Sequence, residues 1–293
     1  RSGQHMIVVE DCYRMTAKFC SIIQKFGIES TFVKPGDYEA LKSAVRPTTR
    51  LILTESPTNP HLNVLDLKKL VPFAKEHRLK VLIDSTLATP INQRPLDFGV
   101  DLVIHSATKY LGGHNDLLLG SVCGASPIIE AIRDYCKVVG TTPDPNSSYL
   151  LIRGLKTLAI RVERQNETAM RIAQYLESHK KIGRVFYPGL ESHSDHRVAV
   201  EQMSGFGGMV SFEIDGGLDC AQRFVHELEI PYLAPSLGGV ETLVSHPATV
   251  SYYDLSQEER LSIGITDELV RYAAGIEDPE DLIADVEQAL EKI

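Results

Sequence analysis

The pattern of apolar and polar positions divides the first part of the chain into short strands and helices that alternate. Apolar runs too short for helices are separated by segments with apolar residues at helical spacing, as at Leu67, Leu70 and Ala74. This alternation is typical of βαβ units and predicts a mostly parallel sheet flanked by helices. The predicted strands are 6–9, 30–33, 49–54, 80–84, 101–105 and 118–123, and the predicted helices are 13–26, 37–44 and 66–77.

The second part of the chain has a different pattern. Residues 147–179 carry an almost unbroken helical pattern, whose length suggests a helix that connects two domains. Strands and helices alternate more loosely after residue 185, which indicates a smaller α+β domain. We therefore expect a large domain over residues 1–165 and a small C-terminal domain over residues 166–293. Nothing precedes strand 6–9 to cover its edge, so we expect the large domain to be incomplete at its N-terminus.

Composition adds limits on function. The chain is 43% apolar and 24% charged, which is typical of a soluble globular protein and argues against disorder. Its net charge of -9 argues against binding to nucleic acids or anionic membranes. The five cysteines lack any CxxC pair, which favours a reducing compartment, the cytoplasm or a plastid stroma. No apolar run approaches the roughly 20 residues that cross a bilayer, so we expect no membrane partner.

The strongest chemical signal lies at the ends of two neighbouring predicted strands. One strand ends in Asp84, and the next is followed by Ser106, Thr108 and Lys109. Because ligands bind α/β sheets at the carboxyl ends of strands, we expect these side chains around one crevice. A carboxylate, two hydroxyls and an amine suit pyridoxal phosphate (PLP): the lysine would form a Schiff base, the aspartate would pair with the pyridinium nitrogen, and the hydroxyls would hold phosphate. The alternative is a loop-capping aspartate and a solvated lysine in a glycine turn.

Two further polar residues extend this hypothesis. Asn59 lies in a rigid turn between Pro57 and Pro60, where its side chain can reach the same crevice and hydrogen-bond a ring hydroxyl or a substrate carboxylate. The alternative is a simple Pro-rich turn. Arg271 lies on an otherwise apolar predicted strand, and a buried arginine requires a partner. Either a carboxylate of the protein or a carboxylate of a ligand neutralises it. The histidines lack the paired spacing of metal ligands, so we expect no metal.

Several motifs together resemble the Cys/Met-metabolism family of PLP-dependent enzymes, and the resemblance covers essentially the whole chain. The lysine motif is the most specific of them. The motifs are Asp11-Cys12-Tyr13-Arg14, Glu55-Ser56-Pro57-Thr58-Asn59-Pro60, Ile83-Asp84-Ser85-Thr86, His105-Ser106-Ala107-Thr108-Lys109-Tyr110-Leu111-Gly112-Gly113-His114-Asn115-Asp116, Ser204-Gly205-Phe206-Gly207-Gly208, Ala234-Pro235-Ser236-Leu237-Gly238-Gly239 and Leu269-Val270-Arg271.

The resemblance implies a fold and a set of site residues. The fold is that of a fold-type I PLP transferase, with a mostly parallel large domain, incomplete at its N-terminus, and a smaller α+β C-terminal domain. The cofactor is PLP. The implied roles are Lys109 as the Schiff-base lysine, Asp84 as partner of the pyridine nitrogen, Ser106 and Thr108 as phosphate ligands, Asn59 beside the ring hydroxyl, and Arg271, helped by Ser236, as the group that binds the substrate α-carboxylate.

The resemblance also implies an activity on amino acids. Asp11-Cys12-Tyr13-Arg14 and Ala234-Pro235-Ser236 resemble the family members that replace the γ-substituent of an activated homoserine ester by cysteine, which forms cystathionine for methionine biosynthesis. Many lyases of the family have an acidic residue in place of Pro235. Cystathionine β-lyases, γ-lyases and homoserine sulfhydrylases share the catalytic residues and remain alternatives.

Two departures from the family pattern bear on these expectations. Family members carry an upstream segment with a phosphate-binding Gly-Met loop and a tyrosine that stacks on the cofactor ring, and it lends a Tyr and an Arg to a neighbouring subunit. We therefore expect a homo-oligomer, a tetramer, with shared active sites, or else a non-catalytic fragment or assembly subunit with the same fold. After Arg271 the family's small hydroxyl residue is replaced by Tyr272-Ala273-Ala274, which changes the surroundings of the arginine.

Overall fold

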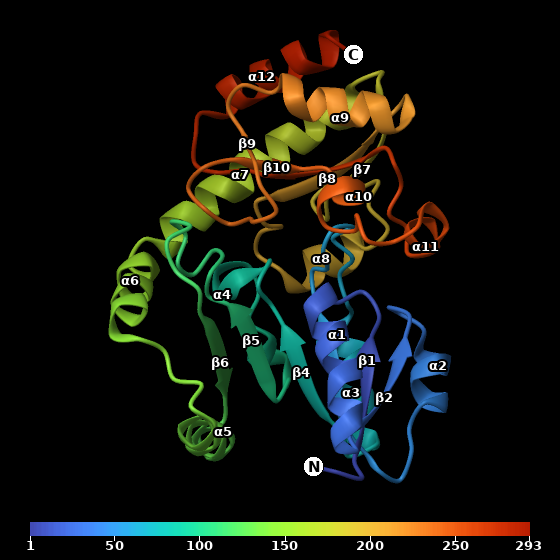
Figure 1. The fold of residues 1–293 in the computed structure, drawn as a ribbon, viewed down its shortest axis with the longest axis vertical. Coiled ribbons are helices and arrows are strands. Elements are labelled where there is room, and N and C mark those ends of the chain that lie inside the picture. The colour runs from blue at the N-terminus through green and yellow to red at the C-terminus, as the bar shows by residue number, and fades with distance from the viewer.

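The chain folds into two α/β domains, one above the other in Figure 1. The computed structural model describes residues 1–293. The N-terminal domain contains a six-stranded sheet in the order β2-β1-β3-β4-β5-β6. Its strands pair in parallel except β6, which is antiparallel to β5. The strands are β1 (His5–Val9), β2 (Glu29–Val33), β3 (Thr49–Glu55), β4 (Lys80–Asp84), β5 (Leu102–Ser106) and β6 (Gly120–Gly124).

Helices cover both faces of this sheet. On one face, Cys20 of α1 packs with Met6 and Val8 of β1. On the other, apolar residues of α2 and α3 pack with Ile7, Ile52 and Ile83. The elements are α1 (Arg14–Ile23), α2 (Tyr38–Ser43), α3 (Leu67–Glu76), α4 (Thr89–Asn92) and α5 (Ser126–Val139), with short 3₁₀ helices η1 (Gln24–Phe26) and η2 (Pro95–Phe98).

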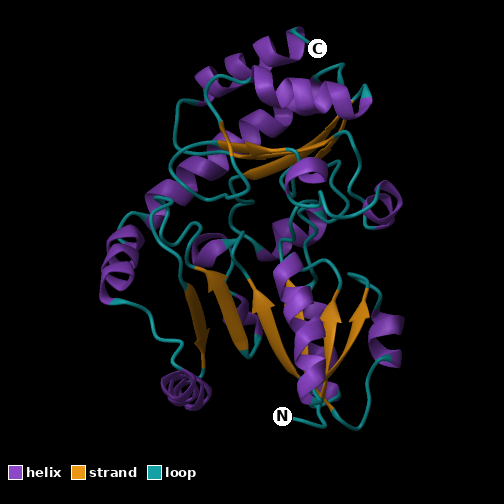
Figure 2. Ribbon diagram, in the orientation of Figure 1, coloured by secondary structure: helices purple, strands orange, loops and turns teal.

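The C-terminal domain contains a five-stranded sheet in the order β7-β8-β11-β10-β9. Its pairs are antiparallel except β9 with β10. Figure 2 shows helices α7, α9 and α12 on the side of this sheet away from the N-terminal sheet. The elements are α6 (Pro145–Leu155), α7 (Leu158–Ser178), β7 (Ile182–Phe186), α8 (His196–Gln202), β8 (Met209–Ile214), α9 (Gly217–Glu227), β9 (Tyr232–Leu233), β10 (Leu243–Ser245), α10 (Pro247–Val250), α11 (Gln257–Ser262), β11 (Leu269–Ala273) and α12 (Pro279–Glu291).

The predicted strands and helices of the first 124 residues are present, with ends shifted by a few positions. The single helix predicted over 147–179 is wrong, because the chain forms α6 and α7 with a break at Lys156 and Thr157. Near this break, α6 contacts the backbone of the lysine loop at Gly154: an added Cβ would lie 2.2 Å from the carbonyl oxygen of Gly112, so only glycine fits. The predicted domain boundary at residue 165 falls within α7 and stays a prediction.

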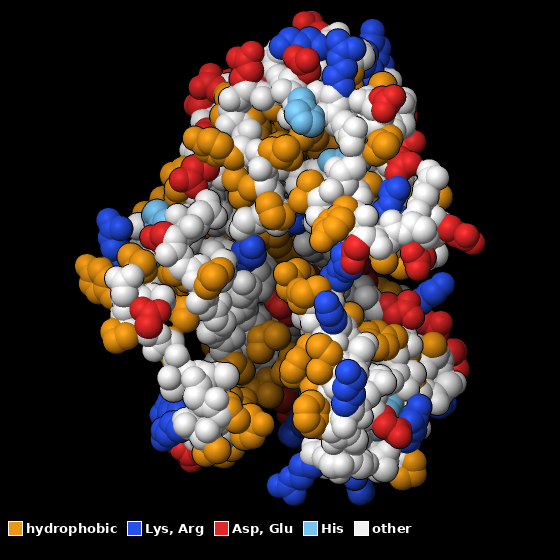
Figure 3. Space-filling view, viewed as in Figure 1, with side chains coloured by type: hydrophobic (Ala, Val, Ile, Leu, Met, Phe, Trp, Pro, Cys, Tyr) orange, Lys and Arg blue, Asp and Glu red, His pale blue; other side chains and the backbone are white.

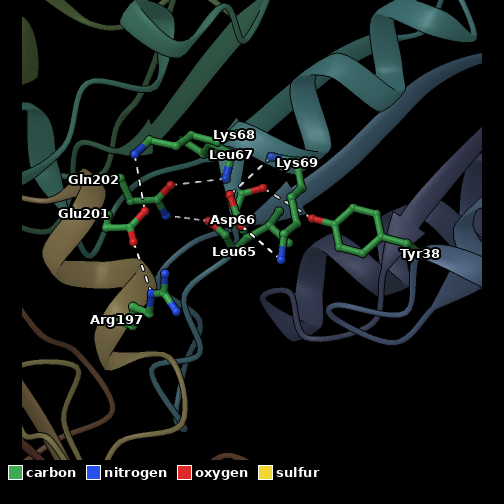
Figure 4. Close-up of polar contacts among 9 residues, drawn as sticks. All are labelled: Tyr38, Leu65, Asp66, Leu67, Lys68, Lys69, Arg197, Glu201 and Gln202. Atoms are coloured by element: carbon green, nitrogen blue, oxygen red, sulfur yellow. Dashed lines mark hydrogen bonds and ion pairs between the residues drawn. The ribbon is translucent and has the colours of Figure 1, made fainter.

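Polar contacts fix the two domains to each other beside α3. Gln202 of α8 donates from Nε2 to the carbonyl of Leu65 at 2.6 Å and accepts at Oε1 from the amide of Leu67 at 3.2 Å. Lys68 pairs with Glu201 at 3.4 Å, as Figure 4 shows. These contacts connect the first turn of α3 to the C-terminal domain. None of the helices combines the length and the hydrophobicity of a bilayer-spanning segment.

Candidate active site

A cleft of about 480 Å³ lies between the carboxyl ends of β3, β4 and β5 and the loops of the C-terminal domain. Figure 3 shows the molecular surface hollowed at this level. The strand order places β4 beside β5, so their ends face one crevice, as the sequence predicts. Among the predicted site residues, the cleft is lined by Asn59, Asp84, Ser106, Thr108, Lys109 and Arg271.

Asp84 ends β4 and is held by the residue that follows it by two positions. Thr86 donates to its Oδ1 from the hydroxyl at 2.5 Å and from the amide at 2.9 Å. Burial raises the pKa of Asp84, and the hydrogen bonds from Thr86 and the nearby His105 act in the opposite direction. Thr86 therefore fixes one oxygen of the carboxyl group and favours its ionised form, which is the form that pairs with a pyridinium.

Lys109 projects into the cleft from the loop after β5. Its Nζ donates a hydrogen bond of 2.8 Å to Oγ of Ser236. Burial, and secondarily the charge of Arg271, lower the pKa of Lys109. The alternative of a solvated lysine in a turn is therefore wrong, and the amine is biased toward its nucleophilic, neutral form.

Arg271 lies on β11 with only 5% of its surface exposed. Its Nη2 donates to the carbonyl of Ser236 at 2.8 Å, and its Nε has no hydrogen-bond partner. Burial lowers the pKa of Arg271 to about 10. None of the ion pairs within residues 1–293 involves Arg271, so no carboxylate of these residues neutralises it. A buried guanidinium with a free donor is suited to binding a ligand carboxylate.

The hydroxyls predicted to bind phosphate lie on the same cleft wall. Thr108 Oγ1 donates to the carbonyl of Leu119 at 3.3 Å and accepts from its amide at 3.1 Å. The amide of Ser106 donates to Oγ1 of Thr86 at 2.8 Å. These bonds fix the backbone around the two residues. Their contact with phosphate stays a prediction.

Helix α7 holds the lysine loop from behind. Arg161, 4% exposed, donates from Nη1 to the carbonyl of Tyr110 at 2.8 Å and from Nη2 to that of Gly154 at 2.9 Å. Gly113 has a φ of 75° and faces this arginine so closely that a Cβ would lie 2.0 Å from it. The second glycine of the lysine motif is therefore required by the packing of Arg161 rather than by a ligand.

Besides Thr86, the cleft wall contains Tyr13, Glu55 and Tyr252, which the sequence patterns did not single out as site residues. The amide of Tyr13 donates to Oε2 of Glu55 at 2.7 Å, and the Tyr13 ring is 55% exposed. Burial, and then the charge of Asp84, raise the pKa of Glu55 well above its usual value. The resemblance placed the stacking tyrosine upstream of this chain, but the chain itself supplies an aromatic ring here. Its position in the motif Asp11-Cys12-Tyr13-Arg14 was the available signal.

Comparison with known proteins identifies the family. The family model for Cys/Met metabolism PLP-dependent enzymes matches residues 1–291. The chain belongs to this family. It is 50% identical over its whole length to cystathionine gamma-synthase 1, chloroplastic, of Arabidopsis thaliana, of which it covers 52%. It is 42% identical to cystathionine gamma-lyase of Bacillus subtilis, of which it covers 77%.

A solved family member has the same fold. The cystathionine gamma synthase of Xanthomonas oryzae pv. oryzae, determined in complex with aminoacrylate and cysteine, superposes with a TM-score of 0.96 at 35% identity. The match covers all of this chain and 76% of that structure. The predicted fold class is therefore confirmed. The chain spans about half the length of the plant synthases it matches, at 52% and 54%.

PLP is the cofactor of this family, and the cleft residues fit it. The fit is seen in a buried amine of lowered pKa, a fixed carboxyl group and the unpartnered donor of Arg271. Lys109 would bond the cofactor, and Asp84 would face its ring nitrogen. Ser106 and Thr108 would lie toward its phosphate, and Tyr13 offers a flat apolar surface to its ring.

Proposed function

We propose that the chain is the cofactor- and substrate-binding part of a cystathionine γ-synthase, which replaces the γ-substituent of an activated homoserine ester by cysteine. The observation that carries this proposal is that Ser236 accepts hydrogen bonds from both Lys109 and Arg271. The serine hydroxyl accepts from Lys109 at 2.8 Å, and the serine carbonyl accepts from Arg271 at 2.8 Å. An amino acid bound by its α-carboxylate at Arg271 is thereby placed next to the amine of Lys109.

The residues divide the chemistry among them. Bound PLP supplies an electrophilic carbonyl carbon and an electron sink for the substrate α-carbon. The amine of Lys109, whose pKa is lowered by burial and by Arg271, would act as the nucleophile toward that carbonyl and, when released from the cofactor, as the general base at the α-carbon. Asp84 would keep the ring nitrogen protonated, and Arg271 would bind the α-carboxylate. Ser236 fixes the direction of the Lys109 side chain between proton transfers.

The identity to a plant synthase supports γ-replacement over elimination. The second candidate is a γ-lyase that acts on cystathionine, which the match to the Bacillus subtilis γ-lyase favours. Incubation of the PLP-loaded chain with cystathionine alone distinguishes them. We expect no keto acid from cystathionine, and cystathionine formation when a homoserine ester and cysteine are both supplied. Release of keto acid from cystathionine alone would favour the lyase.

The first test addresses Lys109. We expect PLP added to the chain of residues 1–293 to give a visible absorbance that borohydride converts into a covalent mass increase. Lys109→Ala should abolish both signals. The control Lys180→Ala removes an exposed lysine without an ion pair and should leave both unchanged. Unchanged borohydride labelling in Lys109→Ala contradicts the proposal, and binding without turnover favours a non-catalytic assembly subunit.

We also propose that the chain assembles as a homotetramer with shared active sites, in the cytoplasm or in a plastid stroma. Exposed apolar side chains support assembly: Leu118 before β6 is 84% exposed, Val138 of α5 85% and Ile160 of α7 72%. Helix α5 buries none of its residues although it carries an apolar face, and Figure 3 shows apolar side chains exposed over α5 and α6. Light scattering coupled to gel filtration measures the assembly. A monomer at micromolar concentration contradicts it.

A further inference from the structure

A second cavity, larger than the cleft, lies at the carboxyl ends of β1, β2 and β3. Its volume is about 630 Å³, and it is lined by 21 residues, of which 6 are hydrophobic. Figure 4 shows part of its wall, where Tyr38 donates to the carbonyl of Asp66 at 3.3 Å and Lys69 pairs with Asp66 at 3.4 Å. Of the residues that line it, only Glu55 also lines the cleft. Nothing in the proposed reaction uses this cavity.

The topology of the sheet places this cavity where ligands bind. Strand β2 lies next to β1 at one edge of the sheet, and β3 lies next to β1 on the opposite flank, so the chain passes β1 on its way from β2 to β3. The first connection, α1, covers one face, and the second, α2, covers the opposite face. The strand order therefore reverses at β1 and β3, and crevices at the carboxyl ends of such reversals are the usual ligand sites of open α/β sheets.

Acidic side chains outnumber basic ones around the cavity. Five acidic residues line it, Glu10, Asp11, Glu55, Asp66 and Asp195, against two lysines. The raised pKa of Glu55 makes it the least negative of the five, so the excess of negative charge comes from Glu10, Asp11 and Asp195. One of the lysines, Lys69, is paired with Asp66. The excess of carboxyl groups favours a cation.

Two of these carboxylates are fixed by the protein and keep one oxygen free. Asp11 accepts at Oδ2 from the Thr58 hydroxyl at 2.5 Å and from Nδ2 of Asn63 at 2.6 Å. Asp195 accepts at Oδ2 from the amide of Val64 at 2.8 Å. In both, Oδ1 has no hydrogen-bond partner within the chain. Each can therefore accept a hydrogen bond from a ligand without losing its present contacts.

A buried hydroxyl on the cavity wall independently indicates a ligand. Thr54 is fully buried, and its Oγ1 has no hydrogen-bond partner. On β3, Thr54 shares a face with Ile52, which packs with α3, and the cavity lies on this α3 side. An unpaired buried hydroxyl costs free energy, which a polar ligand in the cavity would recover.

We propose that this cavity binds a small organic cation through a protonated amine, which donates to Asp11 and Asp195 with Thr54 as a further polar contact. The site is separate from the PLP cleft, and its occupation does not depend on the reaction proposed above. Asp11 also accepts hydrogen bonds from Thr58 and Asn63. The turn between these two residues contains Asn59, which lines the cleft, so this turn would lie next to the bound amine.

The test is calorimetric titration of the chain with 1,4-diaminobutane at constant ionic strength, with 1,4-butanediol and succinate as controls. We expect saturable binding of the diamine only. Asp195→Asn should raise its Kd by about tenfold, because a hydrogen bond to a charged group is lost and an amide donor replaces the free oxygen. Thr54→Val should raise it by about fivefold through loss of a neutral hydrogen bond.

The matched control is Asp281→Asn, which removes an equal charge from the exposed first turn of α12. It should leave the Kd unchanged, and circular dichroism should show that all three variants fold. Amide NMR shifts on titration should be largest around residues 54–66. The proposal is overturned if the diamine does not bind, if succinate binds more tightly, or if the folded Asp195→Asn and Thr54→Val variants bind the diamine like the unsubstituted chain.

Discussion

The PLP cleft and the second cavity lie at the same edge of one sheet and differ in charge. The cleft is lined by Arg14, Lys109 and Arg271 with two carboxyl residues, Glu55 and Asp84. The second cavity has five carboxyl residues and two lysines. A sheet has only a small net dipole, so the backbone does not create this difference. Both ligand sites lie at the carboxyl ends of the strands, and the side chains that follow each strand determine whether an anionic or a cationic ligand fits there.

The two sites also differ in how their charges are satisfied. In the second cavity, Asp11 and Asp195 receive hydrogen bonds from the turn after β3. In the cleft, Arg271 is buried and has only one carbonyl oxygen as an acceptor. A buried cation without an anion is costly, so an anionic ligand group would stabilise the cleft, whereas Asp11 and Asp195 of the cavity remain partly exposed to solvent.

The largest expected effect comes from removing the charge of Arg271. Arg271→Leu should weaken binding of the substrate α-carboxylate by about a hundredfold, because a charge-assisted contact is lost. It should also raise the pKa of Lys109, since the arginine charge is the second cause of its lowered value. PLP capture would then begin at higher pH. Spectral titration with PLP and with amino acid across pH measures both effects.

Arg271→Lys is the matched control for this prediction. It keeps a positive charge in the cleft, so the pH at which PLP capture begins should stay close to that of the unsubstituted chain. Binding of the carboxylate should still weaken, because lysine lacks the bidentate geometry of arginine. If Arg271→Leu and Arg271→Lys have the same pH profile, Arg271 does not act on Lys109 through its charge.

Glu55, which lines both sites, gives the next prediction. Its folded pKa is raised, so its contribution to stability is full below its usual pKa of 4.5 and is lost as pH rises to the folded value. The loss is about 1.4 kcal/mol of unfolding free energy per pH unit in that interval. Glu55→Gln keeps an acceptor for the amide of Tyr13 and should remove this loss.

Urea unfolding at pH 4.5 and at pH 8 measures the effect. The Glu55→Gln variant should be close to the unsubstituted chain in stability at the lower pH and more stable at the higher pH. Glu191→Gln, at an exposed glutamate, should not change with pH in this way. Equal stability of Glu55→Gln and the unsubstituted chain at both pH values would contradict a raised pKa of Glu55 in the folded protein.

Much of the cleft could be predicted because it depends on strand periodicity and strand order. Asp84 and Lys109 follow neighbouring parallel strands, and such strand ends meet wherever the sheet forms. Tyr13 and Thr86 were missed because their roles depend on side-chain directions that local patterns do not specify. The close approach of Gly154 to Gly112, beside the helix break, was missed because it is a contact between residues distant in sequence.

The second cavity could not be predicted from sequence for a related reason. Its acids come from the ends of β1 and β3, the start of α3 and the segment before α8. Each acid alone resembles a solvated surface residue or a helix cap, as Asp66 is for α3. Only the packing of the C-terminal domain beside α3, through Gln202, brings them around one space.

The smallest expected effect concerns the mouth of the cleft, where Arg14 joins the two domains. It donates to the carbonyl of Ser251 at 2.7 Å, pairs with Asp254, and lies 5.7 Å from the ring centre of Tyr252. The Arg14 and Asp254 side chains are 32% and 46% exposed, so solvent screens their attraction. Arg14→Ala should therefore lower the unfolding free energy by about 1 kcal/mol or less.

The same substitution should affect the cleft more than the cavity, because Tyr252 and Ser251 line only the cleft. We expect Arg14→Ala to weaken amino-acid binding by less than about fivefold, with no change in diamine binding. A double-mutant cycle with Asp254→Asn isolates the ion pair from the contact with Tyr252. If the coupling energy is zero while amino-acid binding still weakens, the guanidinium holds the cleft wall through Ser251 and Tyr252 alone. If Arg14→Ala weakens diamine binding equally, the two sites are not independent.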